Sequence, residues 1–182
     1  GAIGDAGALV TNDSKIDHQA RVLRNYGQVN RYEHLEIGMN SRLDELQAAI
    51  LRVRLNWLDE FTARRKQVAL RYREGITNQW VKLLAEPLNP EQHVYHLFVL
   101  TTPFRDQMQQ HLAESGVETL IHYPISADQQ VALAGIETDP LGLPHAQEHA
   151  ETCFSIPCHP QLTDSDLDHV IASVNSFVPR ES

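Results

Sequence analysis

A pair of histidines in this sequence has the spacing of a metal site. His145 and His149 lie four residues apart on an expected helix, so both imidazoles can face the same side. Glu148 and Glu151 are close by, but neither is clearly placed as a third ligand. A solvated helix face is therefore the favoured interpretation, and we assign no metal ligand.

A second histidine pair flanks Tyr95. His93 and His96 lie on or beside an expected strand, where alternation turns residues at odd spacing toward opposite faces of the sheet. The two imidazoles cannot readily share one ligand for that reason. We interpret all three side chains as structural.

The segment from Gly1 to Gly7 is rich in glycine, a composition that can cradle a phosphate group. It lacks the Gly-Lys-Ser/Thr ending of a P-loop, and it precedes an expected strand instead of following one. No serine or cysteine lies in a nucleophile-elbow sequence. The residues alone predict no self-sufficient active site, and we assign no catalytic residue.

Composition limits the class of protein. The 182 residues suffice for one ordinary domain, or for a small domain with a fragment of another. A hydrophobic share of 42% supports a real core, and a formal net charge of −9 argues against a nucleic-acid surface. No apolar stretch approaches the roughly 20 residues of a membrane-spanning helix, and no signal peptide is evident. Two cysteines without metal spacing fit a reducing compartment, so we expect a cytoplasmic protein.

The first forty residues indicate the end of a larger unit. The chain begins without a methionine and enters an apolar run directly, whereas a domain usually has a looser, polar start. Residues 8–10 favour a short strand, and residues 15–25 favour a helix that follows turn and cap side chains. Residues 27–39 show no clear period and are predicted to be a loop.

The longest expected element is a helix, straight or kinked, over residues 41–74. Ser41 and Asp44 have capping-box spacing at its start, and nothing breaks the helical period before Gly75. Such a helix, roughly 50 Å long, should bridge two domains or two subunits. Its apolar stripe contains Leu43, Leu46, Ile50, Val53 and Trp57, and Phe61, Val68 and Tyr72 extend it.

Strands alternate with helices in the rest of the chain. This order predicts an α/β fold, or α+β for the small domain, in which helices pack on a small sheet. The expected strands cover residues 94–101, 117–121 and 154–156, and the expected helices cover residues 105–115 and 146–152 and a last segment from Thr163. The predicted divisions are residues 1–40, a connecting segment at 41–79, and a C-terminal domain at 80–182.

Six phrases occur in a characteristic order along the chain. They are Gly4-Asp-Ala-Gly-Ala-Leu-Val-Thr-Asn12-Asp13, Leu23-Arg-Asn-Tyr-Gly-Gln28, Gly38-Met-Asn-Ser-Arg-Leu-Asp-Glu-Leu-Gln-Ala-Ala-Ile50, His93-Val-Tyr-His-Leu-Phe-Val99, Ile121-His-Tyr-Pro-Ile125 and Phe154-Ser-Ile-Pro-Cys-His-Pro160. The ordered set, which covers nearly all of the chain, resembles the DegT/StrS family of sugar aminotransferases, a branch of the fold-type I pyridoxal-phosphate enzymes.

The resemblance implies a fold and a reaction. Residues 1–40 would end the large cofactor-binding domain, and the connecting helix would lead to the small domain. The implied enzyme uses pyridoxal phosphate to move an amino group, usually from glutamate, to a keto group on a nucleotide-linked deoxysugar. In that family the cofactor is held covalently by a lysine just before the glycine-rich segment, and none of Lys15, Lys66 and Lys82 matches it. We therefore expect this chain to be inactive alone, without covalent cofactor binding.

The resemblance also implies site residues. The asparagine at the Asn40 position would reach the cofactor phosphate of a neighbouring subunit, helped by a helix start with free amides and a favourable dipole. Arg42 would orient the phosphate or the substrate. The alternatives are a helix cap for Asn40 and a surface salt bridge for Arg42. The residues that would approach the sugar nucleotide are Gln28, Tyr32, His34, His122 and Tyr123, with ordinary packing as the alternative.

One segment departs from the family pattern. Where the family commonly continues with a proline and then a histidine, Ser126, Ala127 and Asp128 follow. This puts the substrate side of the cleft in question, and a different sugar or a lost function would explain it. Two other functions stay open: a non-catalytic dimerisation or binding module from a truncated gene, and half of a split enzyme. Exposed apolar surface at residues 8–10 and 43–57 would favour a homodimer or a larger assembly.

Overall fold

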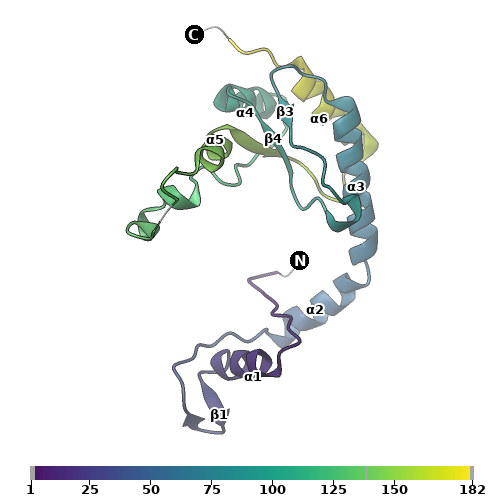
Figure 1. Cartoon of the computed structure of the whole chain (residues 1–182). Coiled ribbons are helices and arrows are strands. Elements are labelled where there is room, and N and C mark those ends of the chain that lie inside the picture. The colour runs from purple at the N-terminus through teal and green to yellow at the C-terminus, as the bar shows by residue number, and fades with distance from the viewer. Residues whose placement is uncertain (1–2, 138, 181–182) are drawn as a thin grey trace. The chain divides into compact units, whose positions relative to one another are not determined.

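The computed structural model describes residues 3–137 and 139–180, so Gly1 and Ala2 of the glycine-rich segment lie outside the described residues. The chain forms two compact units, of which the first ends at Leu58 and the second begins at Asp59 (Figure 1). No helix in the described ranges combines the length and the apolarity needed to cross a membrane.

The first unit consists of two helices and a hairpin. Helix α1 (Ser14–Leu23) begins after Asp13, whose side chain accepts a hydrogen bond from the Lys15 backbone N–H at 2.8 Å. Strands β1 (Gln28–Asn30) and β2 (Glu33–His34) form an antiparallel hairpin, and helix α2 (Glu45–Leu55) follows. Val22 is the one large apolar side chain that is buried among the described residues of this unit.

Two expectations for the first unit were wrong. Residues 8–10 form no strand, Val10 is 94% exposed, and no strand of the described chain pairs with this run. Residues 27–39 contain the β1–β2 hairpin instead of an irregular loop. Short polar strands with an aromatic turn residue carry little periodic signal, which explains why the hairpin was missed.

The predicted helix over residues 41–74 is two helices. Helix α2 starts at Glu45, and helix α3 (Leu58–Gly75) starts after a break at Asn56 and Trp57. The backbone N–H groups of these two residues bond to carbonyl oxygens three residues earlier, at 3.3 and 3.0 Å, and this tighter pattern closes α2. Asparagine competes poorly in helix interiors, which accounts for the position of the break.

The second unit is a small sheet with helices packed on it, as the sequence predicted, and its strands are antiparallel. The strand order is β3 (Lys82–Leu83), β4 (Phe98–Thr101) and β5 (Cys153–Ile156). The other helices are α4 (Arg105–Glu114), α5 (Pro144–Thr152) and α6 (Asp164–Ser176), with short 3-10 turns at 90–92, 127–129 and 131–133. The fold class is thus confirmed.

Two of the expected strands differ from the sequence prediction, whereas β5 extends the expected segment 154–156 by one residue. Strand β4 begins at Phe98 because Tyr95 has a φ of 48°, which is incompatible with an extended chain. The argument from strand alternation for His93 and His96 therefore does not apply. Instead of a strand at 117–121, one bridge joins Leu120 to Ser155 through backbone bonds of 3.2 and 2.7 Å.

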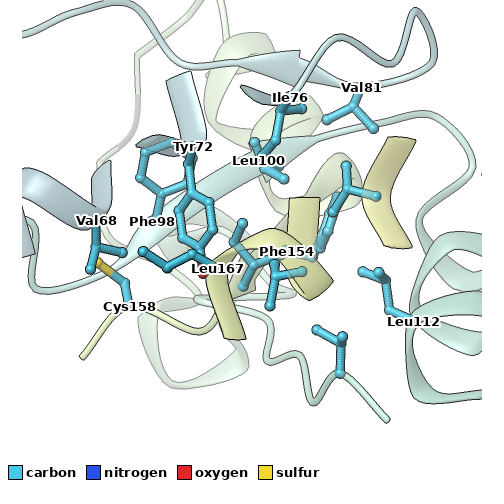
Figure 2. Packing of buried hydrophobic residues seen from close by; sticks show 14 of the residues in the cluster. Val68, Tyr72, Ile76, Val81, Phe98, Leu100, Leu112, Phe154, Cys158 and Leu167 are labelled. Atoms are coloured by element: carbon cyan, nitrogen blue, oxygen red, sulfur yellow. The ribbon is translucent and has the colours of Figure 1, made fainter. Parts of the chain in front are cut away.

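The core of the second unit lies where α3, α4 and α6 meet the sheet (Figure 2). The centre of this core is Tyr72, which is fully buried, and its ring lies 5.1 Å from the ring of Phe98. Its hydroxyl donates to the carbonyl oxygen of Pro157 at 2.8 Å, so the polar end of the side chain is satisfied. Other fully buried members are Val68, Leu100, Met108, Leu112, Phe154, Leu167 and Val174.

Two asparagines join the ends of α3 and α6. Nδ2 of Asn78 donates to the carbonyl oxygens of Val174 and Phe177, at 2.7 and 2.9 Å. Nδ2 of Asn175 donates in the opposite direction, to the carbonyl oxygen of Gly75 at 2.8 Å. These bonds satisfy carbonyl groups that the ends of both helices leave free.

The buried thiol of Cys158 makes the second unit sensitive to alkaline pH. Burial raises the pKa of Cys158 from 9.0 to about 11. Because the pKa is higher in the folded chain, the unfolded state loses its proton first as the pH rises. We predict that the free energy of unfolding falls between about pH 9 and pH 11, by on the order of 2 kcal/mol for this group.

Urea unfolding followed at about pH 8 and about pH 11 measures this loss. Serine in place of cysteine cannot ionise in this range, so Cys158→Ser should lose less stability over the same interval. Burial also raises the pKa of Cys153, so part of the dependence should persist. Equal losses in the natural chain and in Cys158→Ser would contradict the assignment.

Candidate functional site

The turn after α1 depends on two glycines. Gly27 has a φ of 69°, in the region that favours glycine. A Cβ atom on Gly27 would lie 1.8 Å from the carbonyl oxygen of Glu36, and one on Gly38 would lie 2.1 Å from the amide nitrogen of Gly27. Only glycine lets the backbone at position 27 come this close to the backbone at positions 36 and 38. The two ends of the segment 27–38 are therefore in contact.

Backbone bonds beside this contact position Asn40. Asn25 and Asn40 form an isolated antiparallel bridge, and the N–H of Tyr26 donates to the carbonyl oxygen of Met39 at 3.0 Å. Tyr26 has a φ of 60°, so its side chain leaves the turn in a direction that an extended residue would not allow. The result is that Tyr26 and the residues around Asn40 lie side by side.

Arg42 contacts both Asn40, the other residue predicted to bind the cofactor, and Tyr26. Its Nε donates to Oδ1 of Asn40 at 3.0 Å, and its guanidinium carbon lies 5.3 Å from the centre of the Tyr26 ring. The first bond turns the carbonyl side of the Asn40 amide toward Arg42. Among the described residues, Nδ2 of Asn40 has no acceptor and remains a donor. A cation beside a free amide donor suits an oxyanion such as a phosphate group.

Two of the residues predicted to approach the substrate belong to the same cluster. Nδ1 of His34 lies 2.9 Å from the carbonyl oxygen of Tyr26. Oε1 of Gln28 accepts from Nδ2 of Asn25 at 3.3 Å. The structure therefore gathers Gln28 and His34 around the turn that also carries Tyr26.

Tyr32 lies apart from this cluster. It is 80% exposed in the hairpin turn, with a φ of 68°, and the guanidinium of Arg31 lies 5.0 Å from the centre of its ring. No described residue of the Asn40 cluster forms a hydrogen bond with it. Its predicted role in substrate binding stays a prediction.

The expectation that Asn40 starts a helix was wrong. Helix α2 begins at Glu45 with Asp44 as its N-cap, so Asn40 neither caps the helix nor adjoins its free amides. The alternative of a surface salt bridge for Arg42 also fails, because no carboxylate among the described residues pairs with it. Any anion at this position would be held by side chains instead of a helix end.

His122 and Tyr123 belong to the second unit. Nδ1 of His122 lies 2.9 Å from Oγ of Ser155, whereas Tyr123 is 73% exposed. In the segment that departs from the family pattern, Ser126 is buried and Asp128 accepts a hydrogen bond from Gln147 of α5 at 2.7 Å. The departing segment is thus packed onto α5, and the roles of His122 and Tyr123 in substrate binding stay predictions.

The histidine pairs do not build a metal centre. Within residues 3–137 and 139–180, no group of three or more histidine, cysteine, aspartate or glutamate side chains could hold a metal ion. His145 and His149 lie on α5 as predicted. Nδ1 of His93 accepts from the N–H of Tyr95 at 3.1 Å, and the two rings are 4.2 Å apart, so this pair stabilises the bend before β4.

Sequence reasoning missed the role of Tyr26. The residue lies inside a phrase that was recognised, Leu23 to Gln28, but its type gives no sign of a left-handed backbone or of a contact with Arg42. The available signal was the glycine that follows it, because glycine marks a turn that needs a positive φ.

Comparisons with known proteins show the family of this chain. The profile of the DegT/DnrJ/EryC1/StrS aminotransferase family matches residues 2–175. The chain is 42% identical to the erythromycin biosynthesis sensory transduction protein EryC1 of Saccharopolyspora erythraea, over 97% of this chain and 48% of the relative. It is 39% identical to the dTDP-3-amino-3,4,6-trideoxy-alpha-D-glucose transaminase of Streptomyces venezuelae, over 99% of this chain and 48% of the relative.

The fold of this chain is also similar to that of a solved family member. The crystal structure of S. venezuelae DesV superimposes with a TM-score of 0.89 at 38% identity, covering all of this chain and 49% of DesV. The chain thus spans about half the length of the relatives that it matches. A match across nearly the whole chain, in sequence and in fold, shows that this protein belongs to the DegT/DnrJ/EryC1/StrS aminotransferase family.

Proposed function

We propose that this chain is the carboxy-terminal part of a pyridoxal-phosphate-dependent aminotransferase that acts on nucleotide-linked keto-deoxysugars, with glutamate as the amino donor. Family membership and the relative named as a dTDP-sugar transaminase support the proposal. The observation that carries the cofactor part is the Asn40 amide, whose Nδ2 is free to donate while Arg42 holds its oxygen. When bound, pyridoxal phosphate supplies the electron-withdrawing ring through which an amino group passes between substrates.

The side chains present fit the phosphate group of this cofactor. Nδ2 of Asn40 would donate to a phosphate oxygen, and the charge of Arg42 would offset the charge of the anion. Tyr26 would keep the guanidinium in place through its ring face. Gln28 and His34 would hold the hairpin at the edge of the site, through Asn25 and the Tyr26 carbonyl group.

The chain alone should not transaminate, because the covalent bond to the cofactor needs a lysine at the family's position. Lys15 lies in the first turn of α1, and Lys66 is paired with Glu91 at 3.0 Å. Lys82 lies in the edge strand β3. None of the three lies near the Asn40 cluster in sequence.

Titration of the purified chain with pyridoxal phosphate tests this expectation. We predict no stoichiometric covalent product at a single lysine after borohydride reduction and peptide mapping. Pyridoxal, which lacks the phosphate, is the control for nonspecific reaction with surface lysines. Stoichiometric trapping on one lysine, with loss of the visible absorbance band on addition of glutamate, would mean that the chain is active without a lysine at the family's position.

The role of Asn40 can be measured in a chimera in which this chain replaces the matching half of the S. venezuelae transaminase. Asn40→Ala removes the free donor, and we predict that affinity for pyridoxal phosphate falls about tenfold, the loss expected for a charge-assisted hydrogen bond. Asn30→Ala is the matched control, because the Asn30 amide donates to Glu33 within the hairpin, away from Asn40 in sequence. Equal cofactor affinity in the two variants would remove Asn40 from the site.

We further propose that the intact protein is a homodimer or a larger homo-oligomer. The apolar stripe of α2 supports this assembly, since α2 has no buried residue and Leu46 and Val53 are 80% and 62% exposed. An enzyme whose Asn40 reaches a neighbouring subunit's cofactor also requires a second copy.

Light scattering after size-exclusion chromatography tests the assembly. Glutamate on the stripe should weaken self-association, so we predict that the double variant Leu46→Glu, Val53→Glu shifts the chain toward the monomer mass. Leu70→Glu changes a leucine of α3 that is 56% exposed and serves as the control. A monodisperse monomer of the unchanged chain would contradict the proposal.

A further inference from the structure

Arg65 lies at the edge of a pocket of about 370 Å³ in the second unit. One of its nitrogens, Nη1, donates to the backbone carbonyl oxygens of Tyr95, His96 and Cys158. These bonds join the segment before β4 to the segment after β5. The acceptors are neutral, so they orient the guanidinium without neutralising its charge.

The other edge of the same guanidinium, formed by Nε and Nη2, makes no hydrogen bond to the described residues. Among the described residues, Nε and Nη2 of Arg65 have no hydrogen-bond acceptor, and neither belongs to the buried polar atoms that lack a partner. Both nitrogens are therefore open to solvent. The neighbouring cations differ in this respect, because Arg64 pairs with Asp164 and Lys66 pairs with Glu91.

This free edge has a defined chemical preference. Nε and Nη2 of an arginine form a planar fork that matches the two oxygens of a carboxylate or of a phosphate group. Arginine is also a side chain that keeps its positive charge across the physiological pH range. A fixed arginine with an open fork at a pocket is therefore suited to a small oxyanion.

The pocket wall adds further polar groups. His96, His122 and His159 line it together with Glu118. Nδ1 of His122 lies 2.9 Å from Oγ of Ser155, and when this hydroxyl donates, Nε2 of the imidazole carries the hydrogen and can donate to a ligand. The volume lies at the lower end of the range for small-molecule sites, which favours a compact ligand.

We propose that this pocket binds the carboxylate or phosphate group of a small ligand, held by the Nε–Nη2 edge of Arg65 with Nε2 of His122 as a second donor. All of the residues involved belong to the second unit, so the site does not depend on the proposed transaminase function. Glu118 is the opposing charge in the wall and weakens the binding of anions.

The experiment uses the full chain, labelled with ¹⁵N, and observes the arginine Nε–H groups and the backbone amides by NMR. Inorganic phosphate and L-glutamate are titrated separately at constant ionic strength, with chloride as the reference. We expect saturable shifts at Arg65 Nε and at the amides of Cys158 and His159. Arg65→Gln should weaken binding about tenfold, as loss of a charge-assisted pair would. Arg64→Gln removes the same charge outside this pocket and should leave the affinity unchanged.

A second variant keeps the test decisive if Arg65→Gln unfolds the chain. Glu118 is exposed and forms no ion pair among the described residues, so Glu118→Gln should leave the fold intact and strengthen anion binding severalfold. Saturation with glutamate alone assigns a carboxylate ligand, saturation with phosphate alone assigns a phosphate ligand, and saturation with both assigns an unselective oxyanion site. Shifts that do not saturate, or an affinity that Glu118→Gln leaves unchanged, would overturn the proposal.

Discussion

The approach of Gly27 to Gly38 is the constraint on which the arrangement of the first unit depends. It closes the segment between them into a hairpin whose two ends are in contact. The closure places Asn40 opposite Asn25 and allows Tyr26 to reach Arg42. A side chain at either glycine would separate these pairs, and the free donor of Asn40 would no longer have a cation beside it. The position of Asn40 beside Arg42 therefore depends on the absence of a Cβ atom at both glycines.

The second unit is organised by burial. Its sheet is short, but α3 and α6 cover it with residues that follow the helical period, and Tyr72 fills the centre without leaving its hydroxyl unpaired. Arg65 lies on the same helix as Tyr72, close to the edge of this core, and bonds to three carbonyl oxygens. Helix α3 therefore packs one face into the core and, at the edge of that core, holds the cation of Arg65 in a fixed position.

Sequence reasoning succeeded where a pattern is periodic or local. The last helix could be predicted from Thr163 because its start is a local pattern. The capping-box spacing of Ser41 and Asp44 was misleading, since α2 begins at Glu45 and the Asp44 side chain makes no cap bond. Sequence reasoning failed where one backbone angle or one distant contact decides the outcome. The left-handed Tyr95 shortens β4, and the stripe that suggested one long helix gave no sign of the break at Asn56. The contact between Tyr26 and Arg42 spans sixteen positions, which no local pattern records.

The small core of the first unit has a thermodynamic consequence. With Val22 as its one large buried apolar side chain in the described residues, this unit gains little free energy from its own packing. In the proposed homo-oligomer, the partner surfaces that cover this unit would supply the remaining stability. Under that proposal, ligand binding at Asn40 and coverage of the unit would be linked equilibria, in which each strengthens the other by the same factor. A ligand held by Asn40 would then strengthen the association of the subunits in the proposed assembly, and removal of that ligand would weaken it.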